Sequence, residues 1–233
     1  LKAQGLAGKP VADIRIDGAG KKVTRSDNCR VSDLSVFSDN LTFTYEAKSL
    51  PYPIDTSYYD NEKHTQADAL SVIPFMDEMN YEGLSVSGLS DGYYGLTIGG
   101  EFIGRFTARE LERGINMALL QNPPQYKQAM KIRQMNEERW LKERKMREFY
   151  WVEYNLMRKT GMLWACNEAA VDTLRKYRPH DIFLQWNGDL WLQYMHKGIR
   201  EDCVNEQQNL VDRIYEQNKP IPLRIEIKKF TDL

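Results

Sequence analysis

The chain has 233 residues, of which 42% are hydrophobic and 28% are charged, and its formal net charge at pH 7 is −1. This length suffices for one or two domains whose core folds without disulfide or metal crosslinks. A net charge this close to zero argues against nucleic acid or an anionic membrane as the main partner. No window approaches the roughly 18 apolar residues that a membrane span requires. The composition therefore predicts an ordinary globular protein.

The first ten residues favour a helix that ends early. Residues 1–4 read LKAQ, which favours helix, and Gly5 and Pro10 follow as helix-ending residues. A helix this short is not stable by itself in water. We therefore expect residues 1–10 to be the tail of a longer helix whose earlier turns precede residue 1. No signal-peptide pattern is present in this segment.

Residues 11–106 show the alternation of apolar and polar residues that is typical of strands. The pattern is clear at residues 41–45 and 84–86, and again at residues 94–106, where Gly99-Gly100 predicts a hairpin turn. A helix is expected at residues 66–79, divided by a proline at position 74. Together these signals predict a small β-meander.

The segment after the hairpin carries a helix start signal. Thr107 and Glu110 have the spacing of a capping box, which predicts a helix from there to about Leu120. Residues 125–178 lack proline and are rich in Lys, Arg, Glu, Met and aromatics, so one or two long helices are expected. Gly161 is a candidate break between them.

Two further features complete the pattern of elements. Asn187-Gly188 predicts a turn, followed by a helix over residues 189–217. Residues 223–227 then alternate as a terminal strand after Pro220 and Pro222.

No Gly-Asp-Ser occurs in the sequence. The serines in Gly83–Gly88 fall on a predicted strand that turns them toward solvent. A turn is the expected role of Gly18-Ala19-Gly20, since it lacks the third glycine of a dinucleotide fingerprint. We therefore expect no catalytic, cofactor-binding or metal-binding residues in this chain, and no cofactor.

The three histidines do not change that expectation. His64 lies in a polar loop, and His196 lies on a predicted helix among aromatic residues. His180 and Asp181 are adjacent, and adjacent residues cannot by themselves orient an imidazole toward a nucleophile. No pair has the His-x-x-x-His spacing of a helical zinc site.

The cysteines leave the redox compartment open. Cys29, Cys166 and Cys203 are far apart and lack metal-ligand spacing. One disulfide with one free thiol, or three buried thiols, are both compatible with this arrangement.

A basic run spans residues 127–147, but glutamates at offsets of three and four residues accompany it. Such mixed signs predict a solvated helix face with local ion pairs. Helix packing is the expected role of the nearby aromatics, and a carbohydrate-facing platform is the alternative. These aromatics are Trp140, Phe149, Tyr150, Trp151, Tyr154 and Trp164.

Several short motifs resemble the region that follows the catalytic domain in a subset of SGNH (GDSL-like) hydrolases. The resemblance covers residues 1–120 and is strongest between Gly88 and Ala118. Beyond it, the helical layout and the terminal Pro-x-Pro strand look similar. The motifs are Asp27-Asn28-Cys29, Val31-Ser32-Asp33-Leu34, Leu41-Thr42-Phe43, Ser49-Leu50-Pro51-Tyr52-Pro53, Ala69-Leu70, Pro74-Phe75, Glu82-Gly83-Leu84, Gly88-Leu89, Gly92-Tyr93-Tyr94, Leu96, Ile98 and Gly114-Ile115-Asn116-Met117-Ala118.

The resemblance implies serine esterase or acylhydrolase chemistry on an α/β/α sandwich. In that family an early Gly-Asp-Ser supplies the nucleophile, a glycine and an asparagine supply oxyanion donors, and a late Asp-x-x-His supplies acid and base. No position here matches these motifs. Asp60 to His64 is one residue too long and lies in the wrong order. The resemblance implies that the catalytic Asp and His lie shortly before Leu1.

These observations predict an α+β fold with a small β-meander or hairpin region and long helices, packed on an upstream SGNH hydrolase domain. The expected parts are residues 1–10, the tail of a catalytic-domain helix; residues 11–120, a β-rich accessory region ending in a helix; residues 121–218, a helical region; and residues 219–233, a terminal strand.

The expected function is support of the upstream esterase domain, with a possible part in shaping its substrate cleft. Its substrate would be an ester of carbohydrate or lipid type, and the family resemblance alone suggests a location outside the cytoplasm. The alternative is a non-catalytic binding module whose aromatic helices hold a glycan or a protein partner.

Overall fold

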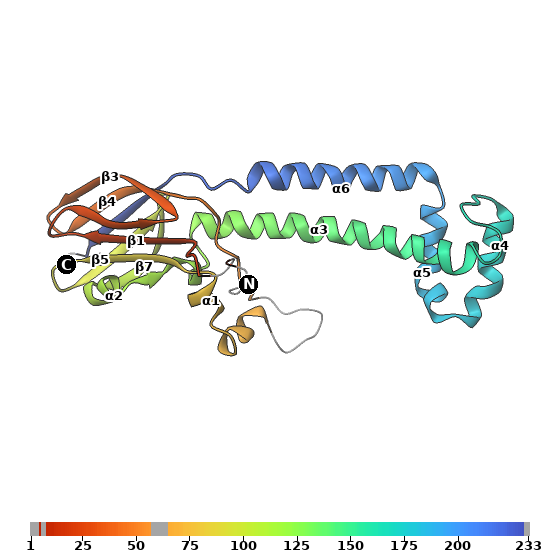
Figure 1. Cartoon of the computed structure of the whole chain (residues 1–233), viewed down its shortest axis with the longest axis horizontal. Helices are drawn as coiled ribbons and strands as arrows, with labels where there is room; N and C mark the ends of the chain where they lie inside the picture. Colours follow the sequence, from red (N-terminus) through yellow and green to blue (C-terminus); the bar gives the residue numbers. More distant parts are fainter. Residues whose placement is uncertain (1–4, 6–7, 57–64, 231–233) are drawn as a thin grey trace. The chain divides into compact units, whose positions relative to one another are not determined.

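The computed structural model describes residues 5, 8–56 and 65–230 of the chain (Figure 1). The chain forms two compact units, a β unit of residues 1–132 and 217–233 and a helical unit of residues 133–216. Of the predicted helix tail at residues 1–10, residues 1–4 and 6–7 lie outside the described residues, as does the polar loop with Asp60 and His64.

The described part of the β unit contains two sheets. One has the strand order β2-β1-β5-β8, with β1 (Ala12–Asp17) parallel to β5 (Glu82–Ser87) and β2 (Lys22–Asp27) and β8 (Ile115–Asn116) antiparallel at its edges. The other is antiparallel in the order β3-β4-β9-β6-β7. Its strands are β3 (Cys29–Phe37), β4 (Asn40–Ala47), β9 (Leu223–Lys229), β6 (Tyr93–Ile98) and β7 (Glu101–Thr107).

One hydrophobic core joins the two sheets. Along β9, Leu223, Ile225 and Ile227 are buried whereas Arg224 is exposed, because successive side chains of a strand point to opposite faces. Their cluster also contains Ile14 of β1 and Leu84 of β5 from the other sheet. The two sheets therefore pack face to face over a shared apolar layer.

The predicted hairpin is confirmed, but its expected third strand pairs elsewhere. β6 and β7 are antiparallel neighbours joined at Gly99-Gly100. β5 instead lies beside β1, where Leu84 is opposite Ile14 and Val86 is opposite Ile16. Alternation along a sequence indicates that a strand exists but not which strand it pairs with.

Short helices connect the strands. The predicted helix at residues 66–79 is divided at Pro74 into a 3₁₀-helix, η2 (Gln66–Ser71), and α1 (Phe75–Glu78). Before α2 (Ala108–Arg113), the side chains of Thr107 and Glu110 form the predicted capping box.

The expected continuation of α2 to Leu120 is wrong. The helix ends at Gly114, whose φ of +93° is accessible mainly to glycine. β8 and the 3₁₀-helix η3 (Met117–Leu119) follow.

The helices after Pro123 begin in the β unit and form the helical unit. They are α3 (Pro124–Val152), the π-helical turn η4 (Glu153–Met157), α4 (Glu168–Tyr177), the 3₁₀-turn η5 (Arg178–His180), α5 (Ile182–Tyr194) and α6 (Lys197–Gln217). Gly161 lies between η4 and α4, where a break was predicted. The core of this unit is built around Phe149, Met157 and Trp191, which are fully buried.

The predicted turn at Asn187-Gly188 is wrong, since both residues lie inside α5. A Cβ at position 188 would lie 3.2 Å from Nε of Arg178. The guanidinium of Arg178 donates to both carboxylate oxygens of Asp189, at 2.6 and 2.7 Å. The glycine therefore permits the close approach of a side chain rather than a change of chain direction.

Several other expectations concern the surface. Ion pairs four residues apart join Arg133 to Glu137 and Arg144 to Glu148 on α3, as the mixed charge pattern predicted. All three cysteines are free, and Cys166 is exposed whereas the other two are buried. Among the described residues, no helix combines the length and apolarity needed to cross a membrane.

Candidate functional site

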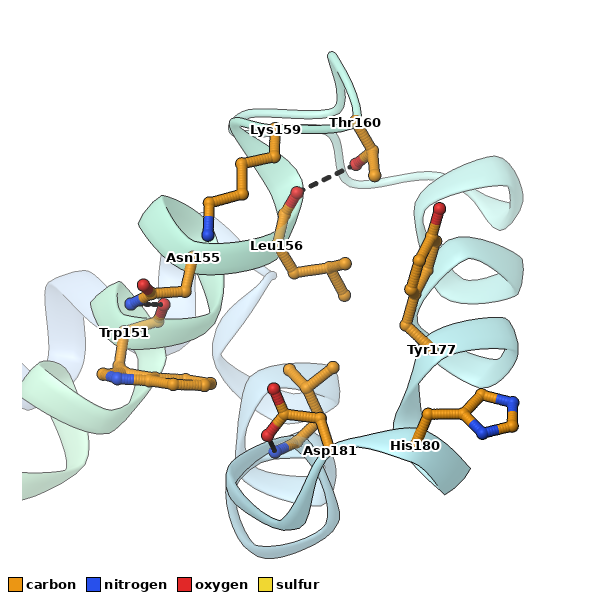
Figure 2. Close-up of a pocket in the computed structure, with 9 residues that line it drawn as sticks. Trp151, Asn155, Leu156, Lys159, Thr160, Tyr177, His180 and Asp181 are labelled. Carbon is orange, nitrogen blue, oxygen red and sulfur yellow. Dashed lines mark hydrogen bonds between the residues drawn. The ribbon is translucent and has the colours of Figure 1, made fainter.

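A pocket of about 340 Å³ opens within the helical unit (Figure 2). Its volume lies in the range of roughly 300–1,000 Å³ that is usual for small-molecule sites. Trp151 of α3, Asn155 and Leu156 of η4, and Lys159 and Thr160 of the next turn line one side. Tyr177 of α4, His180 of η5, Asp181 directly before α5 and Leu184 of α5 line the other.

The π-helical turn positions the first side of the pocket. Single π turns inside longer helices are frequent at functional sites, because they change the direction in which side chains point. Here the turn is held by Glu153, whose side chain is buried. Its carboxylate accepts a hydrogen bond from Nε1 of Trp191 at 2.8 Å and another from the backbone N–H of Trp164 at 2.8 Å. This carboxylate therefore ties η4 both to α5 and to the loop before α4.

Asp181 positions the second side of the pocket. It is the N-cap of α5, and its Oδ1 accepts hydrogen bonds from the backbone N–H groups of Phe183, at 2.8 Å, and Leu184, at 3.2 Å. A side-chain acceptor at this position satisfies N–H groups that have no partner within the helix. The cap thus fixes the carboxylate at the pocket wall.

Figure 2 shows how the lining side chains are directed. Leu156 points into the space in front of the Tyr177 ring, whereas the His180 ring points away from Asp181 and from that space. The adjacent pair His180-Asp181 is therefore not arranged as a base and its orienting acid. In this geometry only the aspartate contributes to the pocket interior.

Several polar atoms of the pocket are available to a ligand. The amide of Asn155 donates to the carbonyl oxygen of Trp151 at 2.9 Å, which fixes the amide plane. Within the described part of the chain, no hydrogen bond reaches Oδ1 of Asn155 or Oδ2 of Asp181, and no acidic side chain pairs with Lys159. The pocket thus offers two acceptors and one cationic donor beside aromatic rings.

An aromatic strip continues from the pocket along α5. The ring centroids of Trp151 and Phe183 are 5.3 Å apart, and those of Phe183 and Trp186 are 5.5 Å apart. Phe183 is 49% exposed and Trp186 is 66% exposed. Trp151 also lines a second hollow of about 320 Å³, together with Trp140 and Asn187. Large aromatics exposed side by side in this way are typical of binding surfaces.

The aromatics singled out from the sequence divide between packing and exposure. Phe149 is fully buried, as the packing interpretation predicts. Tyr150, Tyr154 and Trp164 form a separate exposed group in which both tyrosine rings are edge-on to Trp164, at 6.0 and 5.8 Å. The sequence did not single out Phe183 and Trp186, because a turn was expected close to them.

The remaining sequence candidates lie apart from one another. Nδ1 of His196 is 3.4 Å from Sγ of Cys166. Ser85 and Ser87 are half-buried on β5, as expected for strand residues. His64 lies outside the described residues. Among the residues that the structure does describe, no three His, Cys, Asp or Glu side chains gather as a metal site would require.

A buried carboxyl group in the β unit escaped the sequence analysis. Glu82 opens β5 and is fully buried, and it accepts hydrogen bonds from the Tyr45 hydroxyl at 2.8 Å and from Nε2 of Gln125 at 3.2 Å. Burial raises the pKa of Glu82 to about 7, although both hydrogen bonds oppose the shift. Burial and the neighbouring Glu82 also raise the pKa of Tyr45.

Two comparisons relate this chain to known proteins. Residues 130–219 match the family model described as the diltiazem deacetylase C-terminal helical domain. The solved structure of BT4096, a gut microbial diltiazem-metabolizing enzyme, matches with a TM-score of 0.91 and 36% sequence identity. That match covers 98% of this chain and 52% of BT4096. The chain is similar to part of an enzyme.

Together with the structure, these two matches confirm the predicted α+β class with its hairpin and helices. They also relate the chain to an accessory region of an esterase-like protein, since the matched model is a helical domain of a deacetylase. The chain spans about half the length of BT4096. No curated protein sequence matches the chain.

Proposed function

We propose that this chain is the C-terminal accessory region of an SGNH-type esterase or acylhydrolase. In this proposal the β unit and the helical unit support a catalytic domain that precedes them, and they shape its substrate cleft. The observation that carries the proposal is the match of 98% of this chain to about half of BT4096. The SGNH assignment is supported by the motif resemblance at residues 27–118.

The chemistry of ester hydrolysis agrees with a catalytic set outside this chain. A serine esterase needs a nucleophile within hydrogen-bond reach of a histidine, and donors that stabilise the oxyanion. Within the described residues, neither His180 nor His196 is hydrogen-bonded to a serine, and His196 contacts a thiol. The chain contains no Gly-Asp-Ser in which a nucleophile would lie.

The test compares this chain with a longer protein that includes the preceding domain. Both are assayed on p-nitrophenyl acetate, a small ester that needs no accessory binding. We expect no turnover above background from residues 1–233 and clear turnover from the longer protein, abolished when the serine of its Gly-Asp-Ser is replaced by alanine. Robust turnover by this chain alone, or turnover by the longer protein that survives the serine substitution, would refute the proposal.

A second candidate function is that of a non-catalytic binding module for a glycan or a protein. The aromatic strip of Trp151, Phe183 and Trp186 favours it, since Phe183 and Trp186 are exposed and their rings continue from that of Trp151. The assay above separates the two candidates, because a binding module attached to no esterase domain would leave the longer protein inactive.

A further inference from the structure

We propose that the pocket between Trp151, Tyr177 and Asp181, with the adjoining aromatic strip, is a binding site for an uncharged oligosaccharide. The inference names the substrate class of the accessory role proposed above and rests on that proposal. It takes the ester substrate to be an acylated saccharide that the helical unit holds by its sugar rings.

The walls of the pocket suit a sugar ring. A pyranose has two flat faces of C–H groups and a rim of hydroxyls, so its site needs apolar faces beside polar edges. Trp151 and Tyr177 supply aromatic surface, and Leu156 and Leu184 supply aliphatic surface. Aromatic side chains contribute a large contact area together with a polar edge, which suits a ligand of mixed polarity.

The free polar atoms suit hydroxyl groups. Oδ1 of Asn155 and Oδ2 of Asp181 each have unused acceptor capacity, and a hydroxyl can donate to either. Lys159, which is exposed at the rim, can donate to a ring or hydroxyl oxygen. Asn155 and Asp181 are also held in place by their other hydrogen bonds, at 2.9 Å and 2.8 Å. Binding therefore requires little ordering of these side chains.

The charge of the pocket argues for a neutral ligand. Lys159 and Asp181 carry opposite charges, and the remaining lining residues inside the pocket are neutral. His180 points away from the interior (Figure 2). A phosphate or sulfate would face the Asp181 carboxylate, and an organic cation would face the Lys159 ammonium. Hydroxyl groups can use both side chains without a net charge of their own.

The aromatic strip argues for more than one sugar unit. Trp151 lines the pocket and a second hollow, and Phe183 and Trp186 extend the aromatic surface along α5. A single ring in the pocket would leave Trp186 without a ligand contact. A chain of several units can occupy the pocket and also stack on the strip.

The test measures binding of the 233-residue chain to neutral gluco-, xylo- and manno-oligosaccharides of two to six units by titration calorimetry. We expect millimolar to micromolar binding to at least one series, with affinity rising with chain length. Trp151→Ala should weaken binding about tenfold or more, since it removes a stacking surface of about 1–2 kcal/mol. Trp186→Ala should weaken the long ligands only.

Control variants separate loss of the site from loss of folding. Asn155→Ala changes an exposed residue and should weaken binding while leaving the circular dichroism spectrum unchanged. Asp181→Asn keeps a good helix cap and an acceptor, so it should weaken binding only severalfold. Tyr215→Ala removes a tyrosine that is 73% exposed on α6, away from the pocket lining, and should leave affinity unchanged.

Two results would overturn the inference. One is the absence of binding to every neutral oligosaccharide series at millimolar concentration, and the other is an equal loss of affinity in Trp151→Ala and Tyr215→Ala. Tighter binding of anionic or cationic ligands that weakens with salt would show a charged ligand instead. The outcome is independent of the p-nitrophenyl acetate assay, which uses an ester without sugar rings. Failure of saccharide binding can therefore be distinguished from failure of the esterase proposal.

Discussion

Replacing Glu82 by glutamine isolates the energetic effect of a buried carboxyl group in the β unit. Glu82 is completely buried, and its pKa is raised from 4.5 to about 7 because burial penalises the charged form. The hydrogen bonds from the Tyr45 hydroxyl and from Nε2 of Gln125 favour the charged form, so burial alone raises this pKa.

The sign of the pH dependence follows from the direction of this shift. Between pH 4.5 and pH 7 the folded protein holds a proton on Glu82 that the unfolded chain has released. Stability from this group is therefore fully present below pH 4.5 and is lost as the pH rises to about 7. A pKa raised from 4.5 to about 7 corresponds to about 3 kcal/mol of stability. The difference in unfolding free energy, Glu82→Gln minus wild type, should therefore rise by about 3 kcal/mol between pH 4.5 and about 7.

The assay must follow the β unit separately from the helical unit. All five tryptophans lie between residues 140 and 191, so tryptophan fluorescence reports only on the helical unit. Peptides spanning β1 and β5 report on the β unit when urea-equilibrated samples receive a hydrogen-exchange pulse at one fixed pH. Glu112→Gln, at an exposed carboxyl of α2, is the matched control. A difference between wild type and Glu82→Gln that stays constant within 1 kcal/mol from pH 4.5 to 7.5 would refute the reasoning.

Three further changes test other contacts. Glu153→Gln should destabilise the helical unit by about 1–3 kcal/mol, because one amide oxygen cannot accept hydrogen bonds from both Trp191 and Trp164 in the present geometry. The loss should appear as a lower urea midpoint by tryptophan fluorescence, and an unchanged midpoint would contradict it. Thr107→Ala should cost the β unit about 1 kcal/mol through loss of the α2 cap, with Thr107→Ser close to wild type. Gly114→Ala should cost about 1–3 kcal/mol because its φ is +93°, and a neutral effect on pulse-labelled β5 peptides would show that the chain relaxes there.

The elements that the sequence predicted well depend on neighbouring residues. The β6–β7 hairpin needs only alternation and two glycines, and the α2 cap needs only residues 107 and 110. β9 is equally local, since its alternation alone shows which side chains are buried. The pairing of β5 with β1 joins segments about 70 residues apart, and no pattern within either strand determines it.

The candidate site was less predictable because its parts meet only in the folded unit. Trp151 was noted as an aromatic on a helix, but its role depends on Phe183 of α5. Gly188 suggested a turn, whereas its lack of a side chain accommodates Arg178. A π turn has no sequence signature of its own, so the positions of Asn155 and Leu156 could not be anticipated.

The place of β9 in the sheet has a consequence for how the chain folds. β9 lies between β4 and β6, which do not pair with each other, and it follows all the other strands of the described residues in the sequence. During synthesis on the ribosome, residues 133–216 emerge before β9, so the helical unit can fold first. Until β9 emerges, the edges of β4 and β6 that it pairs with stay without hydrogen-bond partners. The β unit should then form late and slowly, through contacts of high sequence separation. Removal of residues 223–229 would separate the pair β3–β4 from the pair β6–β7, because β9 is the strand that joins them. The open edges of β4 and β6 would then be prone to aggregation.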